Sequence, residues 1–332
     1  MFDYFAGGSG REVTLDEATA AWLRYRLVPR VLVDVSRVVL STSLLGVALP
    51  SPVAVAPVAY QGLLHGDGEQ AMVAGAGPHL TIVSTRASRT IESIAAAATG
   101  PWWFQVYVTA DAALSTALAL RAAAAGAGAL VLTGDTPYIG RKARTGRPVD
   151  LGGAATMANF AQHLAPGADP ARATEQSPAA SLDDIGRLAA TTGLPVLVKG
   201  VLSADDAHRC LDAGAAGVIV STHGGRQLDR AVSTAEALPA VVAAAQGAPV
   251  LVDGGIRSGL DALVALALGA DAVLLGRPAA WALAHGGAPS VTALLEAMDD
   301  ELSHVLALAG CPDLTSVTAD LLHGRGTTAG PR

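Results

Sequence analysis

Eight short apolar runs, each about the length of a β-strand, are spaced between residues 51 and 278. Their residues are continuously apolar, which is typical of parallel strands that are buried on both faces. Alanine- and leucine-rich segments of helical character, such as ALSTALALRAAAAGAG, separate most of them. The runs cover residues 51–59, 79–85, 101–108, 129–136, 195–200, 217–223, 249–255 and 272–278.

This alternation predicts an α/β protein, and eight strand–helix units favour a closed (β/α)8 TIM barrel. The length of 332 residues fits one large α/β barrel or two ordinary domains, and the eight units favour a single barrel domain, 1–332. An open doubly wound sheet is the alternative. It would need a glycine-rich GxGxxG turn after its first strand, and the segment APVAYQG at 56–62 lacks that pattern.

The connection between the fourth and fifth predicted strands, residues 137–194, is much longer than the others. Only its end, from about residue 181 to 192, has the pattern of the expected helix, while 141–180 is rich in Gly, Ala and Pro. Loops of this length in a compact domain are usually functional or disordered. We predict a mobile, lid-like loop over 141–180 at the barrel mouth. The alternative is a disordered insert without a role.

Composition argues against several classes of protein. The net charge is −7 without a basic block, so we expect no nucleic-acid partner and no anionic membrane surface. The two cysteines, Cys210 and Cys311, provide neither a disulfide framework nor a metal-type spacing. Mean hydropathy is high at +0.41, yet no apolar run of about 18 residues and no signal-peptide pattern occurs. We expect a cytoplasmic protein with reduced thiols and no metal.

Polar groups stand at the ends of nearly all the predicted strands, where a (β/α)8 barrel carries its active site. Packing alone does not explain such a distribution, so we predict that these residues share one site. The residues at the strand ends, polar and apolar together, are Pro57, Val58, Ala59, Ser84, Gln105, Tyr107, Thr133, Asp135, Lys199, Ser221, His223, Arg226, Asp253, Gly254, Gly255, Gly276 and Arg277.

The last two strands are followed by the motifs DGGIRSG, at 253–259, and GRP, at 276–278. Glycines that expose backbone N–H groups, together with a helix N-terminus, bind phosphate at this place in many barrels. Arg277 can add a bidentate, charge-assisted contact. GRP alone is compatible with an ordinary turn, but the two motifs together indicate a phosphate site.

The stretch STHGGRQLD and the lysine that ends VLVK suggest redox or acid–base chemistry. Lys199 is suited to stabilise negative charge on an electron-accepting ring, although its head could instead reach the surface. His223 is suited to act as a base held by Asp135, although a hydrogen-bonded core histidine is the alternative. Arg226 and Tyr4 are suited to clamp a carboxylate.

Taken together, the motifs SxHGGRQLD, VLVKG, VDGGIRSG and LGRP resemble the FMN-dependent 2-hydroxy-acid oxidase and dehydrogenase family. Glycolate oxidase, lactate oxidase and mandelate dehydrogenase belong to that family. The resemblance extends from FDYFAGGSG at residue 2 to GRPAAWALA near residue 284. Within the family, DYFAGGSG, APVAYQ, GRPAAWALA and LAGC are most similar to the actinobacterial 4-hydroxymandelate oxidases.

The resemblance implies a bound FMN. Its ring and ribityl chain would contact Pro57, Val58, Ala59, Ser84, Gln105 and Thr133, with Ser221 touching the flavin and Lys199 near the N1/O2 edge of the ring. Its phosphate would be held by the residues from Asp253 through Gly254 and Gly255 to Arg257, and by Gly276 and Arg277.

For the reaction, the resemblance implies that His223 is the base, oriented by Asp135, with Tyr107 and Lys199 also in the catalytic set. The substrate carboxylate and hydroxyl would be bound by Tyr4, Tyr107, Arg226 and Lys142, together with His223. We expect an aromatic, mandelate-like 2-hydroxy acid to be oxidised to the 2-oxo acid, with O2 reoxidising the flavin to give H2O2. Family members often form tetramers, so a homotetramer is expected.

The sequence departs from the family pattern at a few positions. Thr222 precedes the base where Asn is common, and Arg86 stands where glycolate-type members often carry an aromatic residue. Lys142 stands where an arginine is common, with Arg141 and Arg144 adjacent, so Lys142 and Arg141 are alternative replacements for that arginine. The chain also begins almost at the FDYF motif, without the usual preceding helix. These departures affect the expected identity of the substrate far more than the expected binding of FMN. The alternatives are a dehydrogenase that uses a quinone or protein acceptor, an FMN-dependent isomerase, and a flavin-binding protein without turnover.

Overall fold

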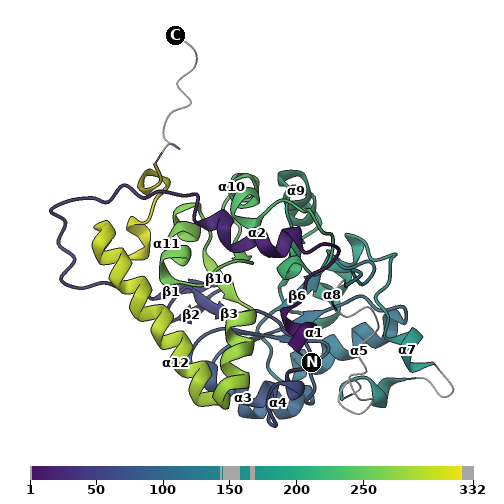
Figure 1. Cartoon of the computed structure of the whole chain (residues 1–332). Coiled ribbons are helices and arrows are strands. Elements are labelled where there is room, and N and C mark those ends of the chain that lie inside the picture. The colour runs from purple at the N-terminus through teal and green to yellow at the C-terminus, as the bar shows by residue number, and fades with distance from the viewer. Residues whose placement is uncertain (1, 143, 145–157, 165–168, 324–332) are drawn as a thin grey trace.

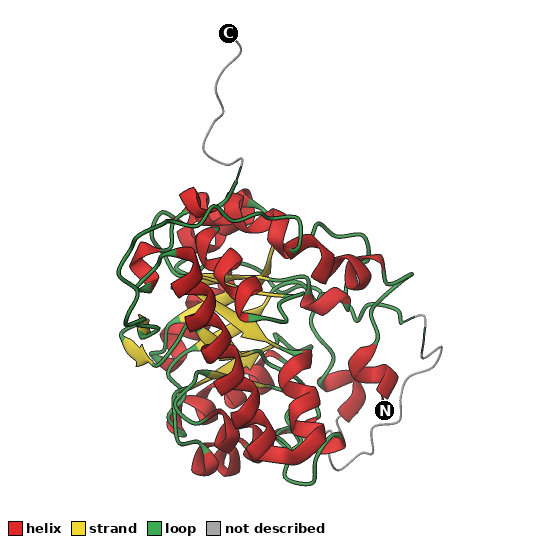
Figure 2. Ribbon diagram, turned by 60° about the vertical axis from the view of Figure 1, so that its left-hand side comes forward, coloured by secondary structure: helices red, strands yellow, loops and turns green. Residues whose placement is uncertain are grey.

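The computed structural model describes residues 2–142, 144, 158–164 and 169–323. Its centre is a closed barrel of eight parallel strands in the order β10-β3-β4-β5-β6-β7-β8-β9, surrounded by helices (Figures 1 and 2). Each of the eight predicted runs contains one strand. The strands are β3 (Val53–Val55), β4 (Thr81–Ser84), β5 (Trp102–Val106), β6 (Leu130–Thr133), β7 (Val196–Val201), β8 (Gly217–Val220), β9 (Val250–Asp253) and β10 (Ala272–Leu275).

The pairing of the first and last barrel strands decides between the two predicted architectures. Val273 of β10 pairs with Val53 of β3, so the sheet has no free edge. The TIM-barrel prediction is confirmed and the open doubly wound sheet is excluded. Every strand of the barrel is fully buried except for one residue of β7, because the side chains face either the barrel interior or the outer helices.

Five of the outer helices begin at a residue whose side chain caps the helix. Thr90, Asp111, Ser203, Ser233 and Ser258 each accept a hydrogen bond from a backbone N–H of the first turn, which satisfies a donor that the helix leaves unpaired. The outer helices are α3 (Glu69–Ala76), α4 (Ile91–Ala97), α5 (Ala112–Ala124), α8 (Asp183–Thr192), α9 (Ala204–Asp212), α10 (Thr234–Ala245), α11 (Gly259–Ala267) and α12 (Arg277–Ala309). In the described ranges, no helix is long and apolar enough to cross a bilayer.

A two-stranded hairpin that the sequence analysis did not predict closes the N-terminal end of the barrel. Its strands are β1 (Thr42–Leu44) and β2 (Val47–Leu49). Leu44 and Leu49 join the same buried cluster as Trp103 and the other inward-facing barrel residues. The barrel is therefore a packed core at this end, and only the opposite end is left for a site.

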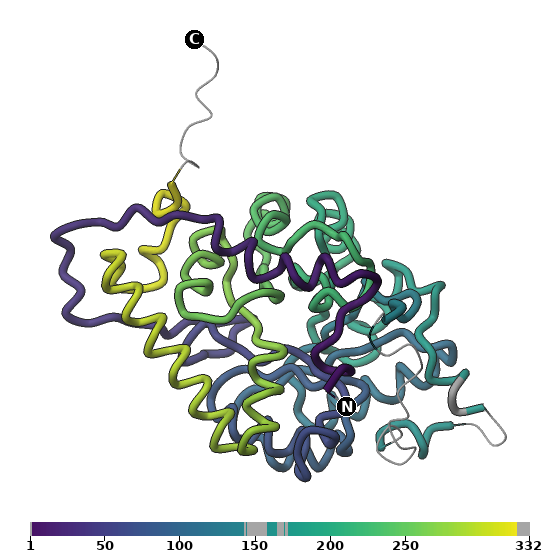
Figure 3. The backbone as a smooth tube through the Cα atoms, viewed as in Figure 1, coloured from purple at the N-terminus to yellow at the C-terminus, as the bar shows by residue number. Residues whose placement is uncertain are grey.

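The N-terminal segment crosses that opposite end. It forms α1 (Phe2–Ala6) and α2 (Val13–Trp22), and Figure 3 shows it as the purple tube running over the green helices. The Trp22 indole donates to the carbonyl of Gly254 at 2.8 Å. Gly225, with φ of 72°, has no room for a side chain, because a Cβ there would lie 2.8 Å from the backbone nitrogen of Leu15. The second glycine of HGG therefore makes space for α2.

The long connection after β6 is described only in part. Its helical end was predicted correctly, since α8 begins at Asp183. The described part before it is tied to the barrel: Asn159 accepts from the backbone of Ile91 at 2.8 Å, Phe160 is buried, and Ser177 donates to Val108 at 2.7 Å. Residues 143, 145–157 and 165–168 of the predicted lid lie outside the described residues, so the lid stays a prediction.

Short helical turns complete the described fold. Most lie in the connections at the barrel mouth or near the C-terminus, and one of them contains the histidine of the HGG motif. They are η1 (Gln61–Leu63), η2 (Ala161–His163), α7 (Pro170–Ala173), η3 (His223–Gly225), η4 (Leu314–Ser316) and η5 (Ala319–Leu321).

Candidate active site

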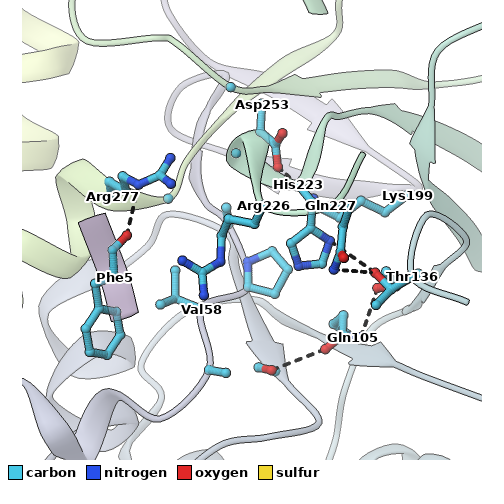
Figure 4. A pocket seen from close by; sticks show the side chains of 18 of the residues that line it. Phe5, Val58, Gln105, Thr136, Lys199, His223, Arg226, Gln227, Asp253 and Arg277 are labelled. Atoms are coloured by element: carbon cyan, nitrogen blue, oxygen red, sulfur yellow. Dashed lines mark hydrogen bonds and ion pairs between the residues drawn. The ribbon is translucent and has the colours of Figure 1, made fainter. Parts of the chain in front are cut away.

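A pocket of about 770 Å3 opens at the C-terminal ends of the barrel strands (Figure 4). Of the predicted site residues, Asp135 and Ser221 do not line it, but both hydrogen-bond to residues that do. The predicted residues that line the pocket are Tyr4, Pro57, Val58, Ala59, Ser84, Gln105, Tyr107, Thr133, Lys142, Lys199, His223, Arg226, Asp253, Gly254, Gly255, Arg257, Gly276 and Arg277.

His223 and Asp135 form a hydrogen-bonded pair, with 3.0 Å between Nδ1 and Oδ1. Among the described residues, the other ring nitrogen, Nε2, has no hydrogen-bond partner, so it can accept a proton when Nδ1 holds one. Burial favours a high pKa for Asp135, but the attraction of His223, its hydrogen bond and the charge of Lys199 outweigh it and lower the pKa. The carboxylate is therefore ionised and able to stabilise an imidazolium.

Local backbone geometry holds this pair in place. His223 has a φ of 55°, a left-handed conformation that non-glycine residues seldom adopt and that is common at functional sites. Gly200 of β7 has a φ of 110°, and a Cβ there would lie 2.5 Å from the Cβ of Asp135. A glycine at position 200 is thus required for Asp135 to sit beside the strand.

Lys199 lies at the base of the pocket and is buried. Its Nζ lies 2.8 Å from Oδ2 of Asp253 and donates to the Ser221 hydroxyl at 2.6 Å. The surface alternative for this lysine is therefore wrong. The Oδ1 atom of Asp253 is buried and has no hydrogen-bond partner among the described residues, so it is an acceptor available to a ligand.

Three polar side chains at the ends of β4, β5 and β6 form a connected row. Gln105 donates through Nε2 to the Thr133 hydroxyl at 2.9 Å, and its Oε1 accepts from the Ser84 hydroxyl at 3.2 Å. All three side chains are buried. The row places hydroxyl and amide groups against the pocket, where they can contact a polar ring or chain.

The other end of the pocket is cationic and rich in free backbone donors. Gly254 and Gly255 have φ values of 89° and 83°, and α12 begins at Arg277 directly after β10. Burial and the neighbouring Arg226 and Arg257 lower the pKa of Arg277 to about 10. No described carboxylate pairs with Arg257 or Arg277, so a phosphate here would relieve this repulsion.

The predicted substrate residues meet near the N-terminal helix. The Arg226 guanidinium stacks on the Tyr4 ring, 4.9 Å from its centroid, and donates to the carbonyls of Tyr4 and Gly7. Lys142 reaches the same place and donates through Nζ to the backbone carbonyl of Arg226 at 2.8 Å. Burial raises the pKa of Tyr4 to about 12 and also raises that of Tyr107, so both phenols remain hydrogen-bond donors.

Several pocket residues were missed by the sequence analysis. Gln227 donates to the Thr136 hydroxyl at 3.0 Å and accepts from the backbone of Gly140 at 2.8 Å, which joins the loops after β6 and β8. Its place inside the STHGGRQLD motif was a usable signal. Phe5 and Tyr60 also line the pocket, but they come from a short helix and a loop without any pattern of their own.

Comparisons with known proteins agree with this geometry. A family model described as FMN-dependent dehydrogenase matches residues 1–324. The chain belongs to this family. Its curated relatives include 4-hydroxymandelate oxidase of Amycolatopsis orientalis, 44% identical over 94% of this chain and 90% of the relative, and L-lactate oxidase of Nostoc sp., 41% identical over 97% and 93%. A solved structure of mandelate oxidase with (S)-4-hydroxymandelic acid superposes with a TM-score of 0.88 at 42% identity, covering 97% and 93% of the two chains.

Membership of the FMN-dependent dehydrogenase family confirms two predictions, the resemblance and the cofactor. The chain is an FMN-dependent oxidoreductase of the 2-hydroxy-acid oxidase type that acts on CH–OH donors. The pocket fits FMN: cationic side chains and glycine N–H groups at one end suit its phosphate, and the unpartnered Asp253 oxygen suits a hydroxyl of its ribityl chain.

Proposed function

We propose that the protein oxidises an aromatic 2-hydroxy acid to the 2-oxo acid and that O2 then accepts the electrons, giving H2O2. The observation that carries the proposal is the His223–Asp135 pair beside Arg226, within a pocket whose far end suits the FMN phosphate. A base and a carboxylate anchor next to a flavin are the groups that oxidation of a 2-hydroxy acid requires.

FMN, when bound, accepts the two electrons that leave the substrate. The protein supplies binding and charge. Lys199 places a buried cation where negative charge develops, and Ser221 holds the Lys199 ammonium. We assign the phosphate to Arg257 and Arg277, together with Gly254 and Gly255 after β9 and Gly276 before α12. The ring and ribityl contacts are assigned to Pro57, Val58, Ala59, Ser84, Gln105, Thr133 and Asp253.

The substrate is held by its acid group. Arg226 binds the carboxylate, because its planar guanidinium matches two carboxylate oxygens. Tyr4 and Tyr107 donate hydrogen bonds through phenols that stay protonated. His223 then removes one proton through Nε2, and Asp135 stabilises the imidazolium that results.

Aromatic side chains around the substrate end support an aromatic substrate. The Tyr4 and Tyr60 rings lie 5.8 Å apart, and the Tyr4 and Phe5 rings are 5.0 Å apart in an edge-to-face arrangement. Such walls suit a planar ring, which gains from edge and offset contacts. The curated relative at 44% identity is a 4-hydroxymandelate oxidase, and this points the same way.

The test is an oxygen-electrode assay of the FMN-loaded protein with (S)-mandelate, (S)-4-hydroxymandelate, (S)-lactate and glycolate. We expect O2 uptake with the aromatic acids, accompanied by equal amounts of H2O2 and 2-oxo acid. Turnover only after addition of a quinone or dye would favour the dehydrogenase alternative. If the protein binds FMN but turns over none of the acids with any acceptor, the alternative of a flavin-binding protein without catalytic activity is favoured.

We also propose a cytoplasmic homo-oligomer, a tetramer by family resemblance. The extended segment 23–41, the purple loop that projects at the left of Figure 1, carries many exposed apolar side chains. Val31 is 80% exposed and Leu32 is fully exposed, which is unusual for aliphatic residues gathered in one segment. Burial of this segment against a second copy of the chain would remove it from water. Light scattering of the purified protein tests the proposal.

A further inference from the structure

Arg86 is a pocket residue with no role in the proposed reaction. It follows β4, which lies four places from β8 in the closed barrel, so Arg86 and Arg226 approach the pocket from opposite sides. Aromatic rings connect them: Arg226 stacks on Tyr4, the Tyr4 and Tyr60 rings are 5.8 Å apart, and Arg86 Nη1 lies 3.3 Å from the Tyr60 hydroxyl. The substrate end of the pocket therefore has a cation at each side and tyrosines between.

Among the described residues, no carboxylate neutralises the charge of Arg86. Its guanidinium donates to the carbonyl of Thr174 at 2.6 Å and to the Tyr60 hydroxyl, and lies 6.0 Å from the Tyr107 ring centroid. No carboxylate in the described ranges lies within ion-pair distance of it. A guanidinium has five N–H donors and cannot lose its charge, so donors remain for a ligand.

When the anionic groups of FMN and of the substrate are assigned to the cationic side chains of the pocket, Arg86 is left without an anionic partner. The FMN phosphate accounts for Arg257 and Arg277, and the substrate carboxylate accounts for Arg226. Lys142 can become neutral, because burial and the nearby Arg226 lower its pKa to about 7. Arg141 also lines the pocket, but it is exposed to water. Among the described lining residues, Arg86 is the partly buried cation with a permanent charge that neither FMN nor a simple 2-hydroxy acid would satisfy.

We propose that Arg86 binds an acceptor oxygen at the end of the substrate side chain remote from the carboxylate. The preferred substrate is then an aromatic 2-hydroxy acid whose ring carries a hydroxyl or a carboxylate group opposite the reacting carbon. The inference rests on the proposed function, because it takes the carboxylate anchor at Arg226 as given. An unsubstituted ring would leave unpaired the guanidinium donors that do not bind Thr174 or Tyr60, which costs binding.

The experiment compares three acids by anaerobic flavin reduction: (S)-mandelate, (S)-4-hydroxymandelate and (S)-4-carboxymandelate. The quantity measured is the reduction rate constant divided by the dissociation constant for each acid, in wild type, Arg86→Met and Arg86→Lys. Arg89→Met is the matched control, since Arg89 is partly buried like Arg86 but does not line the pocket. The 4-hydroxy and 4-carboxy arms distinguish a phenolic oxygen from a second carboxylate.

We expect wild type to favour at least one substituted acid over mandelate by about tenfold to hundredfold, the value of a charge-assisted hydrogen bond. Arg86→Met should bring this ratio close to one while mandelate is still oxidised. Arg86→Lys should restore part of the preference for the 4-carboxy acid. The control Arg89→Met should keep the wild-type ratio. A ratio near one in wild type, or one that survives in Arg86→Met, overturns the inference while leaving the function intact. An equal loss for all three acids would assign Arg86 to holding Thr174 and also overturns it. Failure of wild type with every 2-hydroxy acid would overturn the function and the inference together.

Discussion

The Lys199 ammonium and the Asp253 carboxylate are paired at 2.8 Å, and both side chains are buried beneath the pocket. The lysine comes from β7 and the aspartate from β9, on either side of β8. A buried pair of this kind is costly to break from one side, because the remaining charge has no partner. The pair therefore contributes both to the charge of the site and to its integrity.

Removal of Lys199 should affect the redox step more than FMN binding. In Lys199→Met we expect flavin reduction to slow by about 100- to 1,000-fold, the usual effect of deleting one stabilising charge at a reacting centre. The flavin midpoint potential should also fall, because the reduced anion loses its cation. Potentiometry and stopped-flow absorbance measure the two quantities.

Lys199→Met leaves Asp253 unpaired, so the variant needs a partner control. Lys199→Met combined with Asp253→Asn removes both charges and should recover thermal stability relative to the single variant, but not the reduction rate. A double variant that regains a normal rate would show that Lys199 acts only by neutralising Asp253.

Asp135→Asn tests the orientation of the base. Asparagine keeps the size of the side chain but removes the charge that stabilises the imidazolium of His223. We expect the reduction rate to fall by about 100- to 10,000-fold while FMN content is unchanged. The low pKa of Asp135 means that its carboxylate is ionised throughout the neutral range, so its titration should not appear in the pH profile there. A rate close to that of wild type would remove Asp135 from the catalytic set.

Gly200→Ala should disturb the His223–Asp135 pair although neither of these two residues is substituted. The added Cβ would lie 2.5 Å from the Asp135 Cβ, so the aspartate must move away from His223. Gly193→Ala is the matched control, because Gly193 also has a positive φ, of 70°, but open space around its Cβ position. Both variants should lose stability from backbone strain. Only Gly200→Ala should also slow flavin reduction, and equal reduction rates in the two variants would contradict this account of the packing.

Substrate binding should weaken as pH rises through about 7. The pKa of Lys142 is lowered to about 7, by burial above all, so its ammonium is charged below that pH and neutral above it. An anionic substrate is therefore attracted by an additional charge only on the acid side, and its own carboxylate would move the transition to somewhat higher pH. Dissociation constants from anaerobic titrations across pH 6–9 should rise in wild type. Lys142→Arg should flatten the profile, and a wild-type slope that persists in this variant would assign the titration to another group.

Leu32→Asp should reduce self-association. The side chain is fully exposed in the single chain, so a charge there costs little unless a second copy covers it. We expect light scattering to show a smaller species for this variant than for wild type, with FMN still bound. An unchanged molar mass would place the subunit contact elsewhere.

Much of the fold and of the pocket was predictable because local sequence carries the relevant physics. Continuous apolar runs identify strands buried on both faces, and polar residues at their ends identify the catalytic face. His223, Lys199 and Arg277 were found in this way from their positions relative to the strands. Most roles given to single residues, by contrast, came from the family resemblance, and all of these roles stay proposals.

Pairings between distant segments were not predictable from one sequence. Nothing near Lys199 indicates that Asp253 is its partner, and nothing in HGG indicates that Gly225 must make room for Leu15. The β1–β2 hairpin escaped notice because its strands are too short to show a period. Tyr60 was missed because it belongs to a loop, where no pattern distinguishes a pocket residue from any other.

The central claim is tested most directly by anaerobic mixing of the FMN-loaded protein with (S)-4-hydroxymandelate, followed by admission of air. We predict rapid bleaching of the flavin absorbance, full recovery in air with release of H2O2, and loss of the bleaching in His223→Ala although FMN remains bound. Rapid bleaching in His223→Ala would contradict the assignment of the base. A wild-type flavin that stays oxidised with every 2-hydroxy acid would contradict the proposed function itself.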